Sequence, residues 1–276
     1  MKQISRTLLS SNFSIFPVVD RRDQMLRVGD ADQVNAVPVF INTDRITKTL
    51  GMMAVLLVLS SIAIQLTDQA TGYSSVVIHK MVKLLNVDLE LNIPTFFSTL
   101  ILLFASLLLA AIAFLKDKQK ASYVLHWGVL STGFLFMAFD EAFSVHERLI
   151  EPMRAILGEE NLGILYFAWV VPAFVLILAL SLAYLKFGMS LPANIRCWFI
   201  VAGALYVGAA VGFELIEGIH VEIYGKENLL YIALATVEEA LEMAGVIVFI
   251  RTLLVYLADI SGKLEFRFGQ FSKETK

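Results

Sequence analysis

The sequence has little of what a secreted or soluble domain needs. Its single cysteine, Cys197, excludes an intrachain disulfide. Charged residues make up only 17% of the 276 residues, while 58% are hydrophobic; soluble domains carry roughly 25% charged residues. The first 20 residues contain no continuous apolar core, so we expect no cleavable signal peptide. The composition therefore excludes a disulfide scaffold and an ordinary soluble enzyme, and it indicates an integral membrane protein.

A strongly basic surface is also lacking. The net charge is −3, and no basic stripe or platform of aromatic residues is present in the sequence. Proteins that bind nucleic acid rely on such features. We therefore expect no nucleic-acid partner.

Long apolar windows divide the chain. A transmembrane helix needs roughly 20 apolar residues, and six windows meet that length: 47–67, 95–115, 122–145, 164–186, 196–219 and 229–257. The sequence thus predicts an all-α fold, a polytopic membrane bundle of six transmembrane helices. Residues 45–259 would form the transmembrane domain, residues 1–44 an N-terminal cytoplasmic tail, and residues 260–276 a C-terminal cytoplasmic tail.

The basic residues predict how the bundle is oriented. Lysine and arginine gather in both tails and in the connections after the second and fourth windows, whereas the other connections are net acidic. The positive-inside rule therefore places both termini in the cytoplasm, in a bacterial inner membrane. Ser74–Leu85 has the apolar spacing of an amphipathic interfacial helix on the outer side. It is either a surface strut or a lid.

The remaining windows look like scaffold. Residues 100–114 and 164–185 contain no charge, so we expect both helices to face lipid, with Pro172 kinking the second. In the fifth window, small residues recur every four positions at Ala204, Gly208 and Gly212. Such stripes allow helices to pack closely, and we expect a helix contact there.

Acidic residues stand near the outer ends of three windows. They occur as Asp140-Glu141-Ala-Phe-Ser-Val-His146-Glu147, as Glu214-x-x-Glu217-x-x-His220 and as Glu238-Glu239-x-x-Glu242. At 1.5 Å per residue, Asp140, Glu214 and Glu238 each lie about 28 Å from the inner ends of their spans. A carboxylate inside a membrane costs several kcal/mol unless it is paired. Three separate helices thus place their carboxylates in one layer, which predicts a shared site.

Spacing and ligand chemistry favour a metal. Glu217-x-x-His220 resembles the pair that carboxylate-bridged di-iron bundles use, and a set rich in carboxylates suits iron or manganese better than zinc. Glu141 and His146 lie about 140° apart on an ideal helix, so either the helix loosens after Asp140 or these residues do not serve one site. We expect Glu147 and Glu222 to be ordinary polar residues at the membrane interface. The predicted ligands are Asp140, Glu141, His146, Glu214, Glu217, His220, Glu239 and Glu242.

Several of these motifs carry a resemblance to a known family. Asp140-Glu141-Ala-x-x-x-His146-Glu147 (DEAxxxHE), Val237-Glu238-Glu239-x-Leu241-Glu242-Met243-x-Gly245 (VEExLEMxG), the segment 86–98 and Trp169-Val-Val-Pro172 are similar to a family of uncharacterised multi-pass bacterial membrane proteins. The resemblance covers roughly residues 80–257. It implies a multi-pass fold and a bacterial source, and it carries no activity across.

The function that follows is an integral membrane metalloprotein. We expect a di-metal centre near the outer leaflet, iron being favoured and manganese or zinc possible, that oxidises a membrane lipid or another apolar small molecule. Tyr206 could serve such a centre as a redox or hydrogen-bonding partner, or it could simply be a packing residue. The alternatives are a metal-dependent lipid hydrolase, an ion- or proton-coupled transporter, and an accessory subunit without catalysis. A partner membrane subunit or a homo-oligomer is compatible with each.

Overall fold

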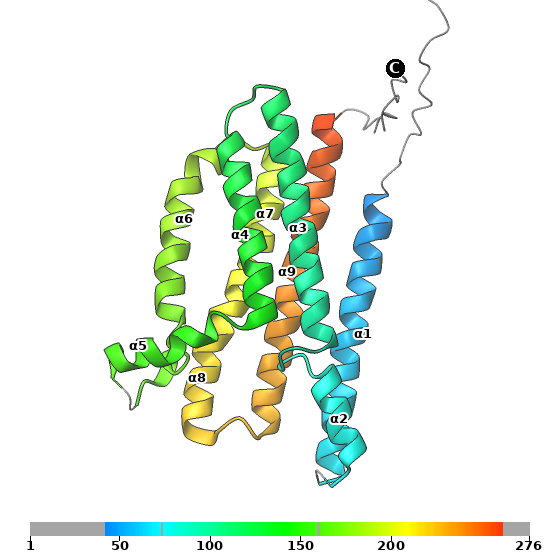
Figure 1. Ribbon diagram of the computed structural model, residues 1–276, viewed down its shortest axis with the longest axis vertical. Helices are drawn as coiled ribbons and strands as arrows, with labels where there is room; N and C mark the ends of the chain where they lie inside the picture. Colours follow the sequence, from blue (N-terminus) through cyan, green and yellow to red (C-terminus); the bar gives the residue numbers. More distant parts are fainter. Residues whose placement is uncertain (1–41, 73, 159–160, 262–276) are drawn as a thin grey trace, which may run out of the picture. The chain divides into compact units, whose positions relative to one another are not determined.

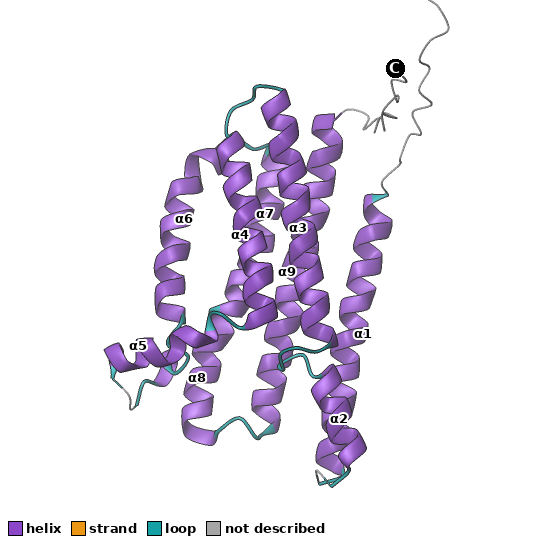
Figure 2. Ribbon diagram, viewed as in Figure 1, coloured by secondary structure: helices purple, strands orange, loops and turns teal. Residues whose placement is uncertain are grey.

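The computed structural model describes residues 42–72, 74–158 and 161–261. Within these ranges the chain consists of helices and connecting loops, without strands (Figure 2). Most of both predicted tails lies outside the described residues. The described ranges all belong to one unit of the chain, Phe40–Leu264. An all-α fold is therefore confirmed for the described part.

Each predicted window corresponds to a helix or to a pair of helices (Figure 1). The third window ends in a bend, and the fifth is divided at Val211 between α7 and α8. The bounds are α1 Thr43–Ala70, α2 Val76–Leu85, α3 Ile93–Lys118, α4 Val124–Phe143, η1 Glu147–Leu149, α5 Ile150–Leu157, η2 Gly163–Leu165, α6 Val170–Ser190, α7 Ala193–Ala210, α8 Gly212–Tyr224 and α9 Leu229–Ser261.

Five of these helices are long and apolar enough to cross a membrane, with α7 and α8 taken together as one of them. The number becomes six if α4 and the segment Glu147–Leu157, which are bent by 78° relative to each other, form one span. The described residues thus have the helices of a multi-pass membrane protein. The orientation of the termini stays a prediction.

Helix α9 forms the centre of the bundle, with α1, α3 and α7 packed along it. Of its most apolar 18-residue window, 61% is buried, compared with 44% for α3 and 11% for α1 and α6. On α3, Ile101, Leu102 and Leu109 are at most 2% exposed. The prediction that residues 100–114 face lipid is therefore wrong for one face of α3, although Leu107 and Phe114 on the helix are exposed. A helix without charges suits the protein interior as well as it suits lipid. The exposed α6 agrees with its prediction.

Two predictions about helix shape also need correction. Pro172 is the third residue of α6, so it lies in the first turn, where proline removes no helical hydrogen bond and causes no kink. A methyl group added at Gly208 or Gly212 would meet nothing within 4 Å, so the predicted small-residue stripe marks no close contact between helices. The close approach occurs instead at Gly245 on α9, which lies against Ala202 and Tyr206 of α7.

Local sequence explains where the helices begin and end. Asn92 caps α3 by accepting from Thr95 N, and Pro94 occupies the first turn, which is where proline is tolerated. Ser75 caps the amphipathic helix α2 by accepting from Ile78 N, which confirms a helix within the predicted segment 74–85. Ser144 ends α4 with a left-handed φ of 47°. The loops 86–92 and 225–228 lie at one end of the bundle (Figure 1), which we call the acidic end.

Candidate functional site at the acidic end of the bundle

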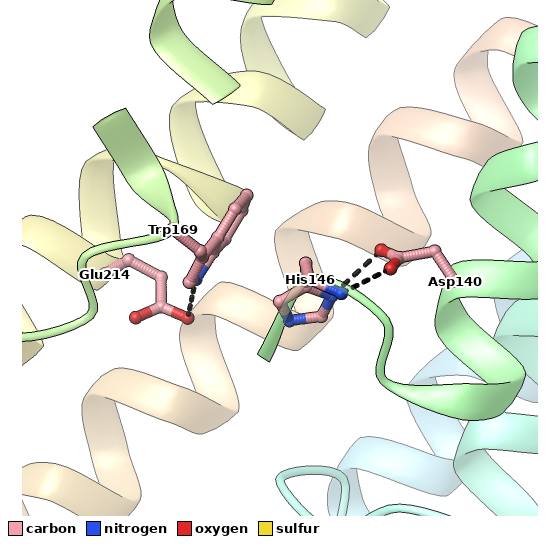
Figure 3. Close-up of polar contacts among 4 residues, drawn as sticks. All are labelled: Asp140, His146, Trp169 and Glu214. Atoms are coloured by element: carbon pink, nitrogen blue, oxygen red, sulfur yellow. Dashed lines mark hydrogen bonds and ion pairs between the residues drawn. The ribbon is translucent and has the colours of Figure 1, made fainter. Parts of the chain in front are cut away.

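The chain at the end of α4 explains why Glu141 and His146 do not keep the angular separation that an ideal helix would give them. Helix α4 stops at Phe143, and the left-handed Ser144 turns the chain away from the helix axis. His146 folds back onto Asp140: its backbone N–H donates to Oδ1 at 2.7 Å, and its ring Nδ1 lies 2.8 Å from Oδ2 (Figure 3). The helix does loosen after Asp140, so an ideal helical phase does not apply to His146.

His146 connects α4 to α8 through a tryptophan. Its ring centroid lies 4.6 Å from that of Trp169, and Trp169 Nε1 donates to Glu214 Oε1 at 3.2 Å (Figure 3). Because Nδ1 of His146 is held by Asp140, the ring's Nε2 is the nitrogen left for another partner. Asp140 therefore fixes the imidazole, and Trp169 fixes one oxygen of Glu214.

Helix α8 contributes two carboxyl groups that each have a buried oxygen without a hydrogen-bond partner. Glu217 is only 3% exposed, and its Oε1 is buried without a hydrogen-bond partner. Oε2 of Glu214 is buried and unpartnered as well. Glu217 also interacts electrostatically with the carboxyl group of Glu238 on α9. Buried polar atoms are satisfied in most proteins, so these two oxygens need an explanation.

Helix α9 brings its carboxylates to the same place. Glu242 interacts electrostatically with Glu141, His146 and Glu214, so α4, α8 and α9 share one cluster. Glu239 interacts with Glu242 and with Glu141. A cavity of about 10 Å³ lies between α3, α4, α7 and α9, and its volume is about what one water or one ion requires. Its polar lining consists of Ser98, Glu141, Tyr206 and Glu242.

The loop 86–92 adds two acidic residues that the sequence analysis did not include. Tyr231 of α9 donates its hydroxyl to Asp88 Oδ1 at 3.2 Å, and Glu90 interacts electrostatically with Glu141 and Glu239. Charged loop residues are normally solvated, which is why these two were passed over. The available signal was the acidic run within segment 86–98, one of the motifs that carry the family resemblance.

The surroundings of this loop raise the pKa of both carboxyl groups. Asp88 is an exposed residue, yet the protein atoms crowded around its carboxylate raise its pKa from 3.8 to about 6 by desolvation, and Lys226 lowers it by a smaller amount. Partial burial likewise raises the pKa of Glu90, opposed by a hydrogen bond from Ser144. Both groups lie outside the apolar helices and can exchange protons with solvent.

Some predicted residues have other partners. His220 Nε2 lies 2.7 Å from Asn228 Oδ1, and its ring packs against Tyr224; the histidine of the Glu-x-x-His pair is thus held by the loop 225–228. Glu222 Oε2 accepts from Gly163 N at 2.6 Å on the exposed surface, and Glu147 is exposed. These last two positions agree with the expectation of interfacial residues. Within the described ranges, no three histidine, cysteine, aspartate or glutamate side chains are arranged around one common point as metal ligands.

An apolar groove lies on the other side of α3. It has a volume of about 330 Å³ and is bordered by α1 and α3, with α3 between it and the small acidic cavity. Its lining is Met53, Leu56, Leu57, Ser60, Ile93, Phe96, Phe97 and Leu100.

The fold and the cluster define the class: an all-α, multi-pass membrane protein with a carboxylate-rich cluster at one end of its helices. Residues 49–257 match the family described as "Domain of unknown function (DUF8692)", and the chain belongs to that family. The matched range includes all the acidic residues of the cluster, from Asp88 to Glu242. No curated protein and no solved structure matches the chain.

Proposed function

We propose that the protein is an integral membrane metalloprotein and that the carboxylate cluster at the acidic end of the bundle is its metal centre. The observation that carries the proposal is Glu217, which is 3% exposed and has an unpartnered Oε1 within a group of other carboxylates. A buried carboxylate without a partner costs several kcal/mol. A bound cation would remove that cost.

The charge of the cluster supports more than one ion. Glu141, Glu214, Glu217, Glu239 and Glu242 come from three helices and interact with one another. Lys226, which is exposed in the loop 225–228, interacts electrostatically with Glu214 and Glu217. One divalent cation would leave most of this negative charge uncompensated, whereas two would balance four carboxylates. A di-metal centre is therefore the favoured form.

The arrangement of His146 is typical of a metal-binding histidine. Such histidines usually give their second ring nitrogen to a carboxylate, which fixes the tautomer and orients the ring. Asp140 holds Nδ1 in this way, so Nε2 of His146 would be the ligand and Asp140 its orienting partner. Since His220 is bonded to Asn228, we assign a single histidine to the centre.

Ligands of this kind suit iron or manganese, because carboxylates are hard ligands that bridge pairs of these ions. A bound iron pair would supply redox chemistry, and we propose an apolar molecule from the membrane as its substrate. The chain's own contribution is to hold the carboxylates in place: Trp169 fixes Glu214, and the packing of Tyr206 against Gly245 fixes one wall of the cavity.

The basic connections support an outer location for the centre. Lys116 and Lys118 lie in the last turn of α3 and Lys120 follows it, while Lys186 and Arg196 flank the connection between α6 and α7. These connections lie at the end of the bundle opposite the loops 86–92 and 225–228 (Figure 1). By the positive-inside rule, the acidic end would face the periplasmic side of a bacterial inner membrane.

Metal analysis of the purified protein tests the proposal. We expect about two equivalents of iron or manganese per chain, and we expect Glu217→Gln, Glu242→Gln and His146→Asn to lose most of them. Glu151→Gln and His79→Asn, which replace exposed residues at the same end of the bundle, should retain them. Loss of metal in the controls as well would refute the assignment of the site.

Other outcomes would favour another function. A single zinc ion held by the same residues would indicate a metal-dependent hydrolase. Absence of metal after both aerobic and anaerobic purification would refute a metal centre, and the electrostatically interacting carboxyl groups of Glu217 and Glu238 would then favour proton-coupled transport.

A further inference from the structure

We infer that the apolar groove between α1 and α3 binds an acyl chain of one anionic phospholipid, whose headgroup is held by Lys80 and Lys83 of α2. The inference is independent of the proposed metal centre, because α3 lies between the groove and the small acidic cavity. Three features of the described residues carry it: the depth of the groove along its two helices, the position of α2 at the end of the groove, and the charge of α2.

The groove follows the apolar part of two membrane-length helices. On α3 its lining begins at Ile93, the first residue of the helix, and ends at Leu100; on α1 it extends from Met53 to Ser60. Each of these stretches rises about 10 Å, which is about two thirds of one leaflet of a hydrocarbon core about 30 Å thick. Apart from Ser60, the residues of the lining are apolar. A surface of this kind suits an acyl chain.

The groove begins at the boundary of the hydrocarbon layer. From Ile93 to Leu115, the residue before Lys116, α3 rises about 34 Å, slightly more than the thickness of the core. Ile93 therefore lies close to the boundary at the acidic end. The buried Ser61 of α1 accepts from Val87 N at 3.1 Å, so the groove end of α1 lies next to the loop that leads into α3.

Helix α2 continues outward from this level. Asp68 Oδ2 of α1 lies 3.7 Å from His79 Nδ1 of α2. Together with the hydrogen bond between Ser61 and Val87, this contact shows that α2 runs antiparallel along the last turns of α1. Helix α2 also packs against α3, and it lies at the end of the bundle where α3 begins (Figure 1). It therefore contacts both helices that border the groove, just outside the apolar layer.

The exposed charge of α2 is positive. Lys80 and Lys83 are both exposed, and the helix contains no acidic residue. Counted from Leu85, the last residue of α2 and the one nearest the groove, they lie about 8 and 3 Å outward. The headgroup layer on each side of the core is about 5–7 Å thick. The two lysines are thus at the depth of lipid phosphates, where basic residues attract anionic headgroups.

The acidic residues close to α2 have other partners. Asp68 is 4% exposed and lies beside His79. In the loop 86–92, Asp88 accepts from the hydroxyl of Tyr231 on α9 at 3.2 Å, and Glu90 interacts electrostatically with Glu141 of α4. Neither α9 nor α4 contributes to the lining of the groove. The lysines of α2 therefore favour an anionic headgroup over a zwitterionic one.

Fluorescence quenching inside the groove tests the inference. A bimane label is placed on Ser60→Cys, which lines the groove, or on Leu178→Cys, an exposed position of α6, both in full-length Cys197→Ser. Competition between brominated phosphatidylglycerol and brominated phosphatidylcholine of equal chain length gives the relative affinity of the two lipids at each label. Two lysines near a headgroup should favour phosphatidylglycerol by about 5- to 30-fold at position 60, with no preference at position 178.

Charge variants show whether the preference comes from α2. Lys80→Gln/Lys83→Gln should abolish it at position 60, while Lys226→Gln, which removes an exposed lysine at the same end of the bundle, should leave it unchanged. Equal preference at the two labels, or a preference that survives Lys80→Gln/Lys83→Gln, would overturn the inference. A label at position 60 that neither lipid quenches would also overturn it, because a protein segment would then cover the groove.

Native mass spectrometry provides a second measurement. Wild type should retain one phospholipid per chain after detergent washing, and Leu56→Trp/Leu100→Trp should lose it, because both side chains line the groove and would fill it. Both positions are exposed, so the larger side chains need not disturb the core. Leu178→Trp/Leu182→Trp, at exposed positions of α6, should retain the lipid; equal lipid content in the two variants would contradict a site in the groove. None of these readouts depends on bound metal.

Discussion

Gly245 is the position where the packing of the bundle makes its sharpest prediction. A methyl group added there would lie 2.9 Å from Tyr206 N, 3.0 Å from Ala202 O and 3.1 Å from Tyr206 Cβ. Two of these three atoms belong to the backbone of α7, which cannot rotate away as a flexible side chain could. Gly245→Ala must therefore push α7 and α9 apart.

The size of the effect follows from two opposing terms. Overpacking of a tight interior site costs about 1–3 kcal/mol, while replacing glycine by alanine inside a helix gains about 1 kcal/mol. Gly208→Ala on α7 is the matched control, because its new methyl group would meet nothing within 4 Å. This variant should show only the stabilisation that comes from replacing glycine by alanine in a helix. Gly245→Ala should thus be less stable than Gly208→Ala by about 1–3 kcal/mol, which is about 5- to 140-fold in the unfolding constant.

Unfolding of the two variants in mixed micelles, titrated with a denaturing detergent and followed by circular dichroism, measures this difference. Tyr206 lines the acidic cavity together with Glu141 and Glu242, so Gly245→Ala should also weaken metal binding, whereas Gly208→Ala should not. The reasoning is refuted if Gly245→Ala is as stable as Gly208→Ala, because α7 and α9 would then not be in close contact at this point.

Three further predictions concern the site and the loop over it. Trp169→Phe removes the donor to Glu214 Oε1 and leaves both oxygens of that carboxylate without hydrogen bonds. It should therefore lower the free energy of unfolding, measured in the same detergent titration, by roughly 1–3 kcal/mol. The control Trp198→Phe changes an exposed residue and should lower it by less than about 0.5 kcal/mol, the usual range for a surface change. Ser61→Ala removes the hydroxyl that anchors the loop 86–92, so amide exchange in that loop should accelerate while exchange in α3 stays slow; Ser60→Ala provides the control, and equal exchange in both variants would contradict the anchoring role. The pKa of Asp88 is raised to about 6, above its unfolded value, so the folded protein binds this proton more tightly and loses stability as the pH rises from about 4 through 6. Asp88→Asn should flatten that part of the stability profile, and an unchanged profile would exclude Asp88 as its source.

The sequence predicted the helices themselves, but it did not predict which helices pack against one another. Apolar length identified the helices that are long and apolar enough to cross a membrane. The mistaken placement of α3 at the lipid surface has a physical reason: lipid and protein interior are equally apolar, so hydropathy cannot distinguish a central helix from a peripheral one. The same limit explains why the contact at Gly245 was missed while Gly208 was favoured.

The residues of the candidate site could likewise be predicted from the sequence only in part. Depth along three helices predicts one layer for Glu141, Glu214 and Glu242, because helical rise is fixed by backbone geometry, and Glu242 interacts electrostatically with the other two. It could not place His146, whose position depends on the left-handed Ser144 and on the turn that follows α4. Nor could it include Asp88, which reaches the cluster only because α1 fixes its loop.

The sequence by itself determined that this chain has apolar, membrane-length helices with acidic residues in one layer, since length, hydropathy and helical rise are local properties. Only the tertiary structure decided which acids meet, which histidine joins them and which acid lacks a partner. His146 joins the cluster through Asp140 and Trp169, while His220 is held by Asn228. These choices depend on contacts between segments far apart in the chain, and no local pattern encodes them.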